Sequence, residues 1–173
     1  VLVPEIVETL RDYPEVSILA AGGIVTGKQM AACMAMGAEG AWTGSVWLTT
    51  AEAETHPVIK EKMLQANSRQ TVRSRSRTGK YTRQLRSPWT DAWHAAEAPD
   101  PLPMPLQGLV SGPALQKIDK LALSGDPGAK ALSTYWVGQG VGLMNETIGA
   151  RSVVREFMED FAGAAERLGE LME

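Results

Sequence analysis

Two glycine-containing turns, separated by one βα unit, are the part of this sequence best suited to bind a ligand. Residues 20–24 read Ala-Ala-Gly-Gly-Ile, residues 43–45 read Thr-Gly-Ser, and each turn follows a short apolar segment. A glycine directly after a strand lets the backbone approach a ligand closely, because no Cβ intervenes and a positive φ costs little. Two adjacent parallel strands that end in this way direct their backbone N–H groups toward one point, and such a point suits a phosphate group.

Neighbouring residues strengthen the prediction of a phosphate site. Ser45 adds a hydroxyl that can donate to a phosphate oxygen. Thr26 is a suitable N-cap for a helix over residues 27–36, and the positive end of that helix dipole would lie close to the first turn. The same arrangement follows strands 7 and 8 of many (β/α)8 barrels. The alternative is that both turns are purely structural turns of an α/β core.

A basic stretch between residues 70 and 87 is the second candidate site. It contains Arg73, Arg75, Arg77, Lys80, Arg83 and Arg86. The segment around Thr78-Gly79-Lys80 could turn a hairpin whose charged face is simply solvated. Its functional interpretation is a docking surface for an anionic substrate such as a coenzyme A thioester. Nucleic acid fits less well, since Tyr81 is the one aromatic residue interleaved with these charges.

The remaining polar residues offer no catalytic or metal-binding constellation. His56 and His94 are the two histidines, and neither has a partner at metal-ligand spacing. We therefore predict no catalytic residue and no metal site. The glycine-rich residues 138–142 lack the context of a dinucleotide fingerprint, which follows a strand and opens a long helix. They could form a loop that closes over a bound substrate, or a plain turn.

The elements that must position the two glycine turns follow one another in the order helix, strand, helix, strand. Residues 4–12 have helical apolar spacing, and residues 27–36 lie between an N-cap threonine and the helix-ending Gly37. Residues 16–20 read as a short strand covered on both faces, and residues 40–43 read as the next strand. Short connections in this order predict consecutive βα units of a parallel sheet or barrel. The fold class is therefore α/β. Further helices are expected near residues 57–67, 111–123 and 152–171, after a proline-rich connector at residues 98–105.

Composition restricts the class of protein. The chain has 173 residues with 44% hydrophobic and 21% charged content, which is typical of a globular domain. A formal net charge of −3 gives no reason to expect a nucleic-acid or membrane partner. We see no apolar run of membrane-spanning length and no signal peptide at residue 1. A single cysteine, Cys33, fits a reducing compartment, and we predict a cytoplasmic location.

The motifs together resemble the C-terminal half of the nitronate monooxygenases, formerly called 2-nitropropane dioxygenases, which are FMN-dependent TIM-barrel enzymes. The resemblance covers nearly the whole chain in order. It is carried by residues 20–24, 36–38, 44–45, 56–57, 103–105 and 136–143. It implies the last two βα units of a (β/α)8 barrel with a C-terminal helical extension.

The resemblance also implies the cofactor and the residues that hold it. The FMN phosphate would be bound by Ala21, Gly22, Gly23, Thr43, Gly44 and Ser45. Ser45 stands where the family commonly has threonine, Ala21 where many members have serine, and Thr43 where glutamine is frequent. Family members carry a histidine beside the flavin on an earlier strand, and nothing in this chain matches it. We therefore expect a fragment that needs the N-terminal part of the barrel, and whose sheet flanks would otherwise be exposed.

Three parts and three functions follow as expectations. Residues 1–67 would form the FMN-binding βα units, residues 68–105 the basic hairpin and connector, and residues 106–173 a helical segment that packs on the barrel. The first function is FMN-dependent oxidation of alkyl nitronates with oxygen. The second is an FMN-dependent NAD(P)H:quinone reductase or an enoyl or acyl coenzyme A thioester reductase of the same fold. The third is a non-catalytic phosphate- or flavin-binding module.

Overall fold

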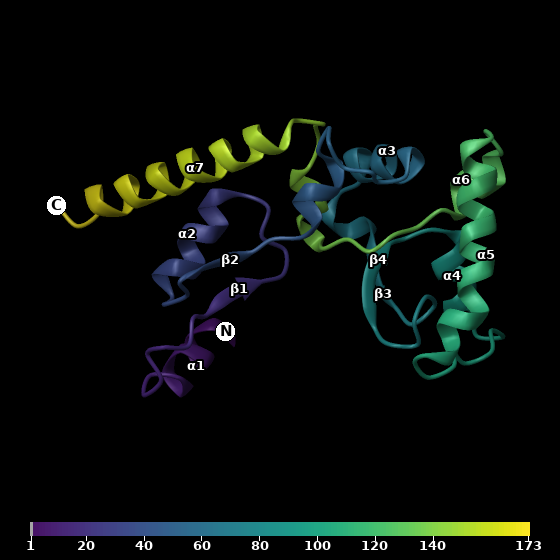
Figure 1. Ribbon diagram of the computed structural model, residues 1–173, viewed down its shortest axis with the longest axis horizontal. Helices are drawn as coiled ribbons and strands as arrows, with labels where there is room; N and C mark the ends of the chain where they lie inside the picture. Colours follow the sequence, from purple (N-terminus) through teal and green to yellow (C-terminus); the bar gives the residue numbers. More distant parts are fainter. Residues whose placement is uncertain (1) are drawn as a thin grey trace. The chain divides into compact units, whose positions relative to one another are not determined.

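The computed structural model describes residues 2–173, and these form two compact units. Among the described residues, the first unit comprises residues 2–53 and Thr147–Glu173, and the second comprises Glu54–Glu146. Figure 1 shows the helices and strands of both units. The expected three-part division at residues 67 and 105 concerns roles within a larger barrel, and it stays a prediction.

The first unit has the predicted order of elements. Its elements are α1 (Leu2–Thr9), β1 (Leu19–Ala21), α2 (Gly27–Ala35), β2 (Gly40–Trp42), the 3-10 helix η1 (Ser45–Thr49) and α7 (Ala150–Glu170). Strands β1 and β2 pair in parallel, with Leu19 opposite Gly40 and Ala21 opposite Trp42. Helix α2 connects them, so that β1, α2 and β2 form one βαβ unit (Figure 1).

Strand β1 is shorter than predicted and is covered on one face only. The chain is still turning at Val16, whose N–H donates to the carbonyl oxygen of Tyr13 at 3.0 Å, so the strand begins at Leu19 instead. Ala20 is buried, but Leu19 is 51% exposed and Trp42 on the paired strand is 71% exposed. The prediction of a strand covered on both faces is therefore wrong for these residues, and the sheet has one open apolar face.

Helix α2 begins and ends as the sequence predicts. Thr26 is the N-cap and forms a capping box with Gln29, which satisfies backbone N–H groups that the first turn of a helix leaves unpaired. Gly37 follows the helix with φ +99°, a conformation that costs a residue with a Cβ about 1–2 kcal/mol. These two signals fix α2 between β1 and β2.

Helix α7 packs closely against α2 at a glycine. A Cβ added to Gly27 would overlap the carbonyl oxygen of Phe157 and come within 2.7 Å of the Asp160 Cβ. Val153 and Phe157 are the buried residues of α7, and Lys28 of α2 lies 3.7 Å from the Asp160 carboxylate. The C-terminal helix is therefore held on the same helix whose N-terminus adjoins the first glycine turn.

The second unit is built around an antiparallel hairpin and helices. Its elements are α3 (Pro57–Gln65), η2 (Ser68–Gln70), β3 (Thr71–Ser74), β4 (Thr82–Leu85), α4 (Pro88–His94), α5 (Leu106–Leu123), α6 (Pro127–Leu132) and η3 (Gln139–Leu143). The predicted hairpin is confirmed, since β3 and β4 pair antiparallel and Gly79 lies in the connecting turn with φ +83°. Helix α5 starts five residues earlier than expected, directly after the proline-rich connector.

Apolar packing and one lysine hold the helices of this unit together. Leu115, Ile118 and Ala122 of α5 form a buried cluster with Ala129 of α6. Lys62 of α3 donates to three carbonyl oxygens at the C-terminal end of α6, at distances of 3.0, 3.0 and 2.6 Å. Burial lowers the pKa of the Lys62 ammonium, while the three carbonyl acceptors favour its charged form.

The strands of residues 2–173 form two separate two-stranded sheets, and these residues contain no closed barrel. None of the helices in this range is both long enough and apolar enough to cross a membrane.

The contact at Gly27 leads to a test of how α7 is attached. In Gly27→Ala, helix propensity favours alanine by about 1 kcal/mol, but overlap with the backbone of Phe157 outweighs this gain. We expect the variant to lose about 1–3 kcal/mol of unfolding free energy, measured by urea denaturation.

Gly163→Ala, in the same helix pair, is the matched control. A Cβ at Gly163 would meet nothing within 4 Å, so this variant should be neutral or more stable by up to about 1 kcal/mol. Equal stabilities for the two variants would contradict the close packing of α7 on α2.

Candidate phosphate-binding site

Strand register brings the two glycine turns together. Ala21 and Trp42 are paired residues at the carboxyl ends of adjacent parallel strands, which lie about 4.8 Å apart. The residues that follow them are Gly22 and Gly23 on one strand and Thr43 to Ser45 on the other. All six sequence-predicted residues therefore lie at one edge of the sheet, within the first unit. Their role in binding a ligand stays a prediction.

The first turn has the backbone conformation that glycine permits. Gly22 and Gly23 have φ values of +106° and +73°. A Cβ added at either position would meet nothing within 4 Å, so no packing contact of the described residues requires glycine there. The positive φ values explain why glycine occupies both positions, and the space beside both residues is open.

Gln29 holds the first turn in place, and sequence reasoning missed this role. Its side-chain oxygen accepts from the N–H groups of Val25 and Thr26, at 2.8 and 3.1 Å. Its side-chain nitrogen donates to the carbonyl oxygen of Gly23 at 3.2 Å. The Thr-x-x-Gln spacing of a capping box is the signal that could have found it. The Gln29 side chain is therefore hydrogen-bonded to the backbone of three loop residues, Gly23, Val25 and Thr26.

The second turn is held by a tryptophan. The Trp47 indole N–H lies 3.0 Å from the Thr43 hydroxyl oxygen and 3.2 Å from the Thr43 carbonyl oxygen. Because the hydroxyl accepts from Trp47, its own proton can still be donated. Gly44 is exposed, and a Cβ there would meet nothing within 4 Å. Ser45 follows as the first residue of η1 and is half-buried.

The chemistry of this edge is that of an anion site. Gly22, Gly23 and Gly44 each adjoin open space, Thr43 and Ser45 carry hydroxyls at the same end of the sheet, and the nine-residue helix α2 begins shortly after the first turn. Glu39, at the opposite end of β2, is the acidic residue nearest in sequence to either turn, and it accepts from the Ser17 hydroxyl at 2.8 Å. The residues present therefore fit a phosphate group.

In the second unit, three of the basic residues of the hairpin have internal partners. Arg75 donates to the carbonyl oxygens of Gly79 and Pro101 at 2.9 and 3.0 Å. Arg86 pairs with Asp91 at 2.8 Å. Arg77 donates to the carbonyl oxygen of Thr134 at 2.8 Å. Arg75 and Arg77 therefore support the structure of the hairpin.

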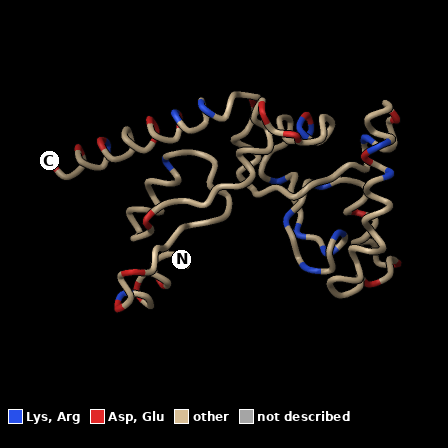
Figure 2. The backbone as a smooth tube through the Cα atoms, in the orientation of Figure 1, with Lys and Arg blue, Asp and Glu red and all other residues tan. Residues whose placement is uncertain are grey.

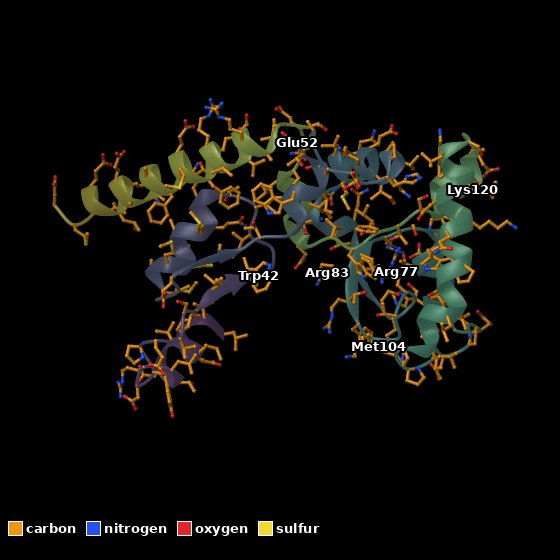
Figure 3. All side chains as sticks on the ribbon, viewed as in Figure 1. Trp42, Glu52, Arg77, Arg83, Met104 and Lys120 are labelled. Carbon is orange, nitrogen blue, oxygen red and sulfur yellow. The ribbon has the colours of Figure 1, made fainter. Side chains whose placement is uncertain are left out.

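Arg77 also lies against two aromatic rings. Its guanidinium carbon is 4.5 Å from the centre of the Trp136 ring and 5.3 Å from that of Tyr135. Burial lowers the pKa of the Arg77 guanidinium, and the nearby Asp119 carboxylate partly opposes this change. Figure 3 labels Arg77 beside helix α5, and the Ser111 hydroxyl of that helix donates to the Arg77 carbonyl oxygen at 2.7 Å.

The two histidines both lie in the second unit. His56 Nε2 lies 2.9 Å from the carbonyl oxygen of Asp119, which connects the start of α3 to α5. His94 is the exposed last residue of α4. Across residues 2–173, no group of three or more His, Cys, Asp or Glu side chains is arranged to hold a metal ion.

Comparison with known proteins identifies the family. The family model described as nitronate monooxygenase matches residues 1–160, and the chain belongs to this family. A Mycobacterium tuberculosis protein with a provisional monooxygenase name, Rv1533, is 54% identical over 176 residues, which cover 100% of this chain and 45% of that protein. A Bacillus subtilis protein named probable nitronate monooxygenase is 28% identical over 92% of this chain and 43% of its own length.

Solved structures with the same fold agree with this assignment. A nitroalkane oxidase from Streptomyces ansochromogenes has a TM-score of 0.76 at 27% identity, covering 96% of this chain and 45% of that chain. FabK from Thermotoga maritima has a TM-score of 0.75 at 27% identity, covering 99% and 51%. The chain thus spans about half the length of the relatives it matches.

The position of Gln29 leads to a test of how the first turn is held. Gln29→Ala removes the acceptor for two backbone N–H groups and the donor to Gly23, so we expect a loss of about 1–2 kcal/mol of unfolding free energy. Hydrogen exchange of the Val25 and Thr26 amides should become faster. Gln116→Ala, on the exposed surface of α5, is the control and should change neither quantity. Unaltered hydrogen exchange of the Val25 and Thr26 amides in Gln29→Ala would contradict the role of Gln29 in holding the first turn, here called the Gln29 clamp.

Proposed function

We propose that the site at the ends of β1 and β2 binds the phosphate group of FMN. The supporting observation is that Gly22, Gly23 and Gly44 adjoin open space at adjacent strand ends, where no described side chain fills the volume. Ala21, Thr43 and Ser45 complete the binding set, with the two hydroxyls as donors to phosphate oxygens. Membership of the nitronate monooxygenase family supports FMN as the ligand.

We further propose that β1 and β2 are the last two strands of a (β/α)8 barrel. Leu19 and Trp42 make an exposed apolar face on the paired strands, and further strands of the barrel would cover it. The N-terminal part of the barrel is then the partner of this chain. It would also carry the residue that exchanges a proton with the substrate, because the family resemblance implies a histidine beside the flavin on an earlier strand and nothing in this chain matches it.

The activity proposed for the complete barrel is oxidation of alkyl nitronates with oxygen. FMN supplies the electron transfer in such a reaction, and the protein positions and tunes it. This chain would anchor the phosphate through the first turn and its Gln29 clamp, and would orient the cofactor through the second turn and Trp47. Its role in catalysis would be to hold the cofactor in one position relative to the substrate.

A reductase acting on a thioester or quinone is the second candidate, and the basic hairpin favours it. Seven Lys and Arg residues and no acidic residue lie between residues 68 and 87, which suits an anionic substrate. Oxidation of NADH without oxygen uptake would support this reductase. Oxygen uptake that depends on an added alkyl nitronate would support the monooxygenase.

The phosphate site can be tested by flavin titration. Gly23→Ala introduces a methyl group into the open space at φ +73°, where alanine is strained by about 1–2 kcal/mol. We expect FMN affinity to fall at least tenfold, measured by quenching of flavin fluorescence. Riboflavin, which lacks the phosphate, should bind weakly to the parent protein and be less affected by the substitution.

Gly108→Ala in α5 is the matched control, because its Cβ would also meet nothing within 4 Å. It should leave FMN affinity unchanged. If Gly23→Ala bound FMN as tightly as Gly108→Ala, the phosphate site would not lie at the first turn.

A further inference from the structure

The β3–β4 hairpin places two arginines opposite one another. Arg73 and Arg83 are paired residues in the antiparallel register, so their side chains leave the same face of the hairpin. Like charges directly opposite each other destabilise a strand pair. Figure 2 shows the Lys and Arg positions gathered along this hairpin. The stability of the hairpin alone therefore does not explain why two arginines are paired at this position.

Other arginines of the stretch have partners that Arg73 and Arg83 lack. Arg75 and Arg77 donate to backbone carbonyls, Arg77 also lies against aromatic rings, and Arg86 pairs with Asp91. Arg73 and Arg83, by contrast, have no carboxylate within ion-pair distance among the described residues. Arg83 donates to the Thr71 hydroxyl at 3.0 Å, and Arg73 lies over the Tyr81 ring at 5.3 Å. Figure 3 labels Arg83 on the side of the hairpin away from α5.

The surface formed by Arg73, Arg83 and Tyr81 is the basic face of the hairpin. It is held in shape from behind: Gly79 approaches residues 102–104 so closely that a Cβ would overlap the Leu102 carbonyl oxygen, and Arg75 ties the turn to Pro101. Tyr81 is 64% exposed, and Arg73 covers one side of its ring. The other side can stack on a flat base.

We propose that the basic face binds the phosphoadenosine diphosphate part of coenzyme A, and so docks a coenzyme A thioester. Guanidinium pairs match phosphate oxygens in a bidentate manner, and an exposed ring beside them suits adenine. The choice of coenzyme A rests on the oxidoreductase class proposed above, because a thioester supplies an acyl chain that can be oxidised or reduced. The docking itself needs no flavin, so its failure would leave the FMN proposal intact.

The test is calorimetric titration of the purified protein with coenzyme A at low and moderate salt. We expect saturable binding that weakens as salt rises. Arg73→Gln combined with Arg83→Gln should weaken it at least tenfold and reduce the salt dependence. The matched control combines Lys117→Gln and Lys120→Gln, two exposed cations of α5, and should change the affinity less than twofold.

Substitutions of Tyr81 test the contribution of ring stacking to coenzyme A binding separately from that of charge. Tyr81→Leu should weaken coenzyme A binding severalfold, whereas Tyr81→Phe should retain it. Without ligand, Arg73→Gln should unfold at the same or a higher urea concentration than the parent, since it removes the like-charge contact. No saturable binding, equal weakening by both double variants, or binding of NADP(H) or an acidic peptide in place of coenzyme A would overturn the proposal.

Discussion

The parallel pairing of β1 and β2 is the constraint on which the candidate site depends. Three pairs of residues, ending with Ala21 and Trp42, set the register. A shift by one residue would move one turn about 3.3 Å along the sheet and exchange the faces of every side chain. The Glu39 N–H, which donates to the Ile18 carbonyl oxygen at 2.8 Å, extends this pairing before the strands begin. Helix α2 supplies the connection, and its capping residue Gln29 also bonds to Gly23 of the first turn, so the same few residues support both the fold and the site.

The second unit shows how one type of side chain serves two purposes. Arg75 and Arg77 satisfy backbone carbonyls and pack on aromatic rings, whereas Arg73 and Arg83 stand opposite each other with no carboxylate partner. The two roles follow from position in the hairpin: Arg73 and Arg83 are paired residues of β3 and β4, whereas Arg75 and Arg77 lie beyond the end of β3, in the segment that connects the strands. A charge run in a sequence is therefore not one surface. Arg75 and Arg77 hold the connecting segment through their carbonyl partners.

Local signals predicted most of the elements, and contacts over long sequence distances account for the differences. Thr26, Gly37 and the turn at Gly79 were predictable because capping and positive φ depend on neighbouring residues alone. The start of β1 and the exposure of Leu19 were not, since an apolar run does not reveal how many faces are covered. Gln29 was missed although its spacing is a capping signal. The different roles of Arg73 and Arg75 were not predictable either, because they depend on where β3 ends and on the contact of Arg75 with Pro101, 26 residues further along the chain.

The glycine at the crossing of α2 and α7 carries an evolutionary consequence. No side chain of any size fits at Gly27 while the Phe157 backbone lies where it does. A lineage that replaced this glycine would have to let α7 shift outward, and that shift would loosen the packing of the helix that follows the glycine turn. The variant would therefore pass through a stage of reduced stability until substitutions in α7 restored the contact. Through this contact, substitutions in the C-terminal helix α7 and substitutions near the site constrain one another during evolution.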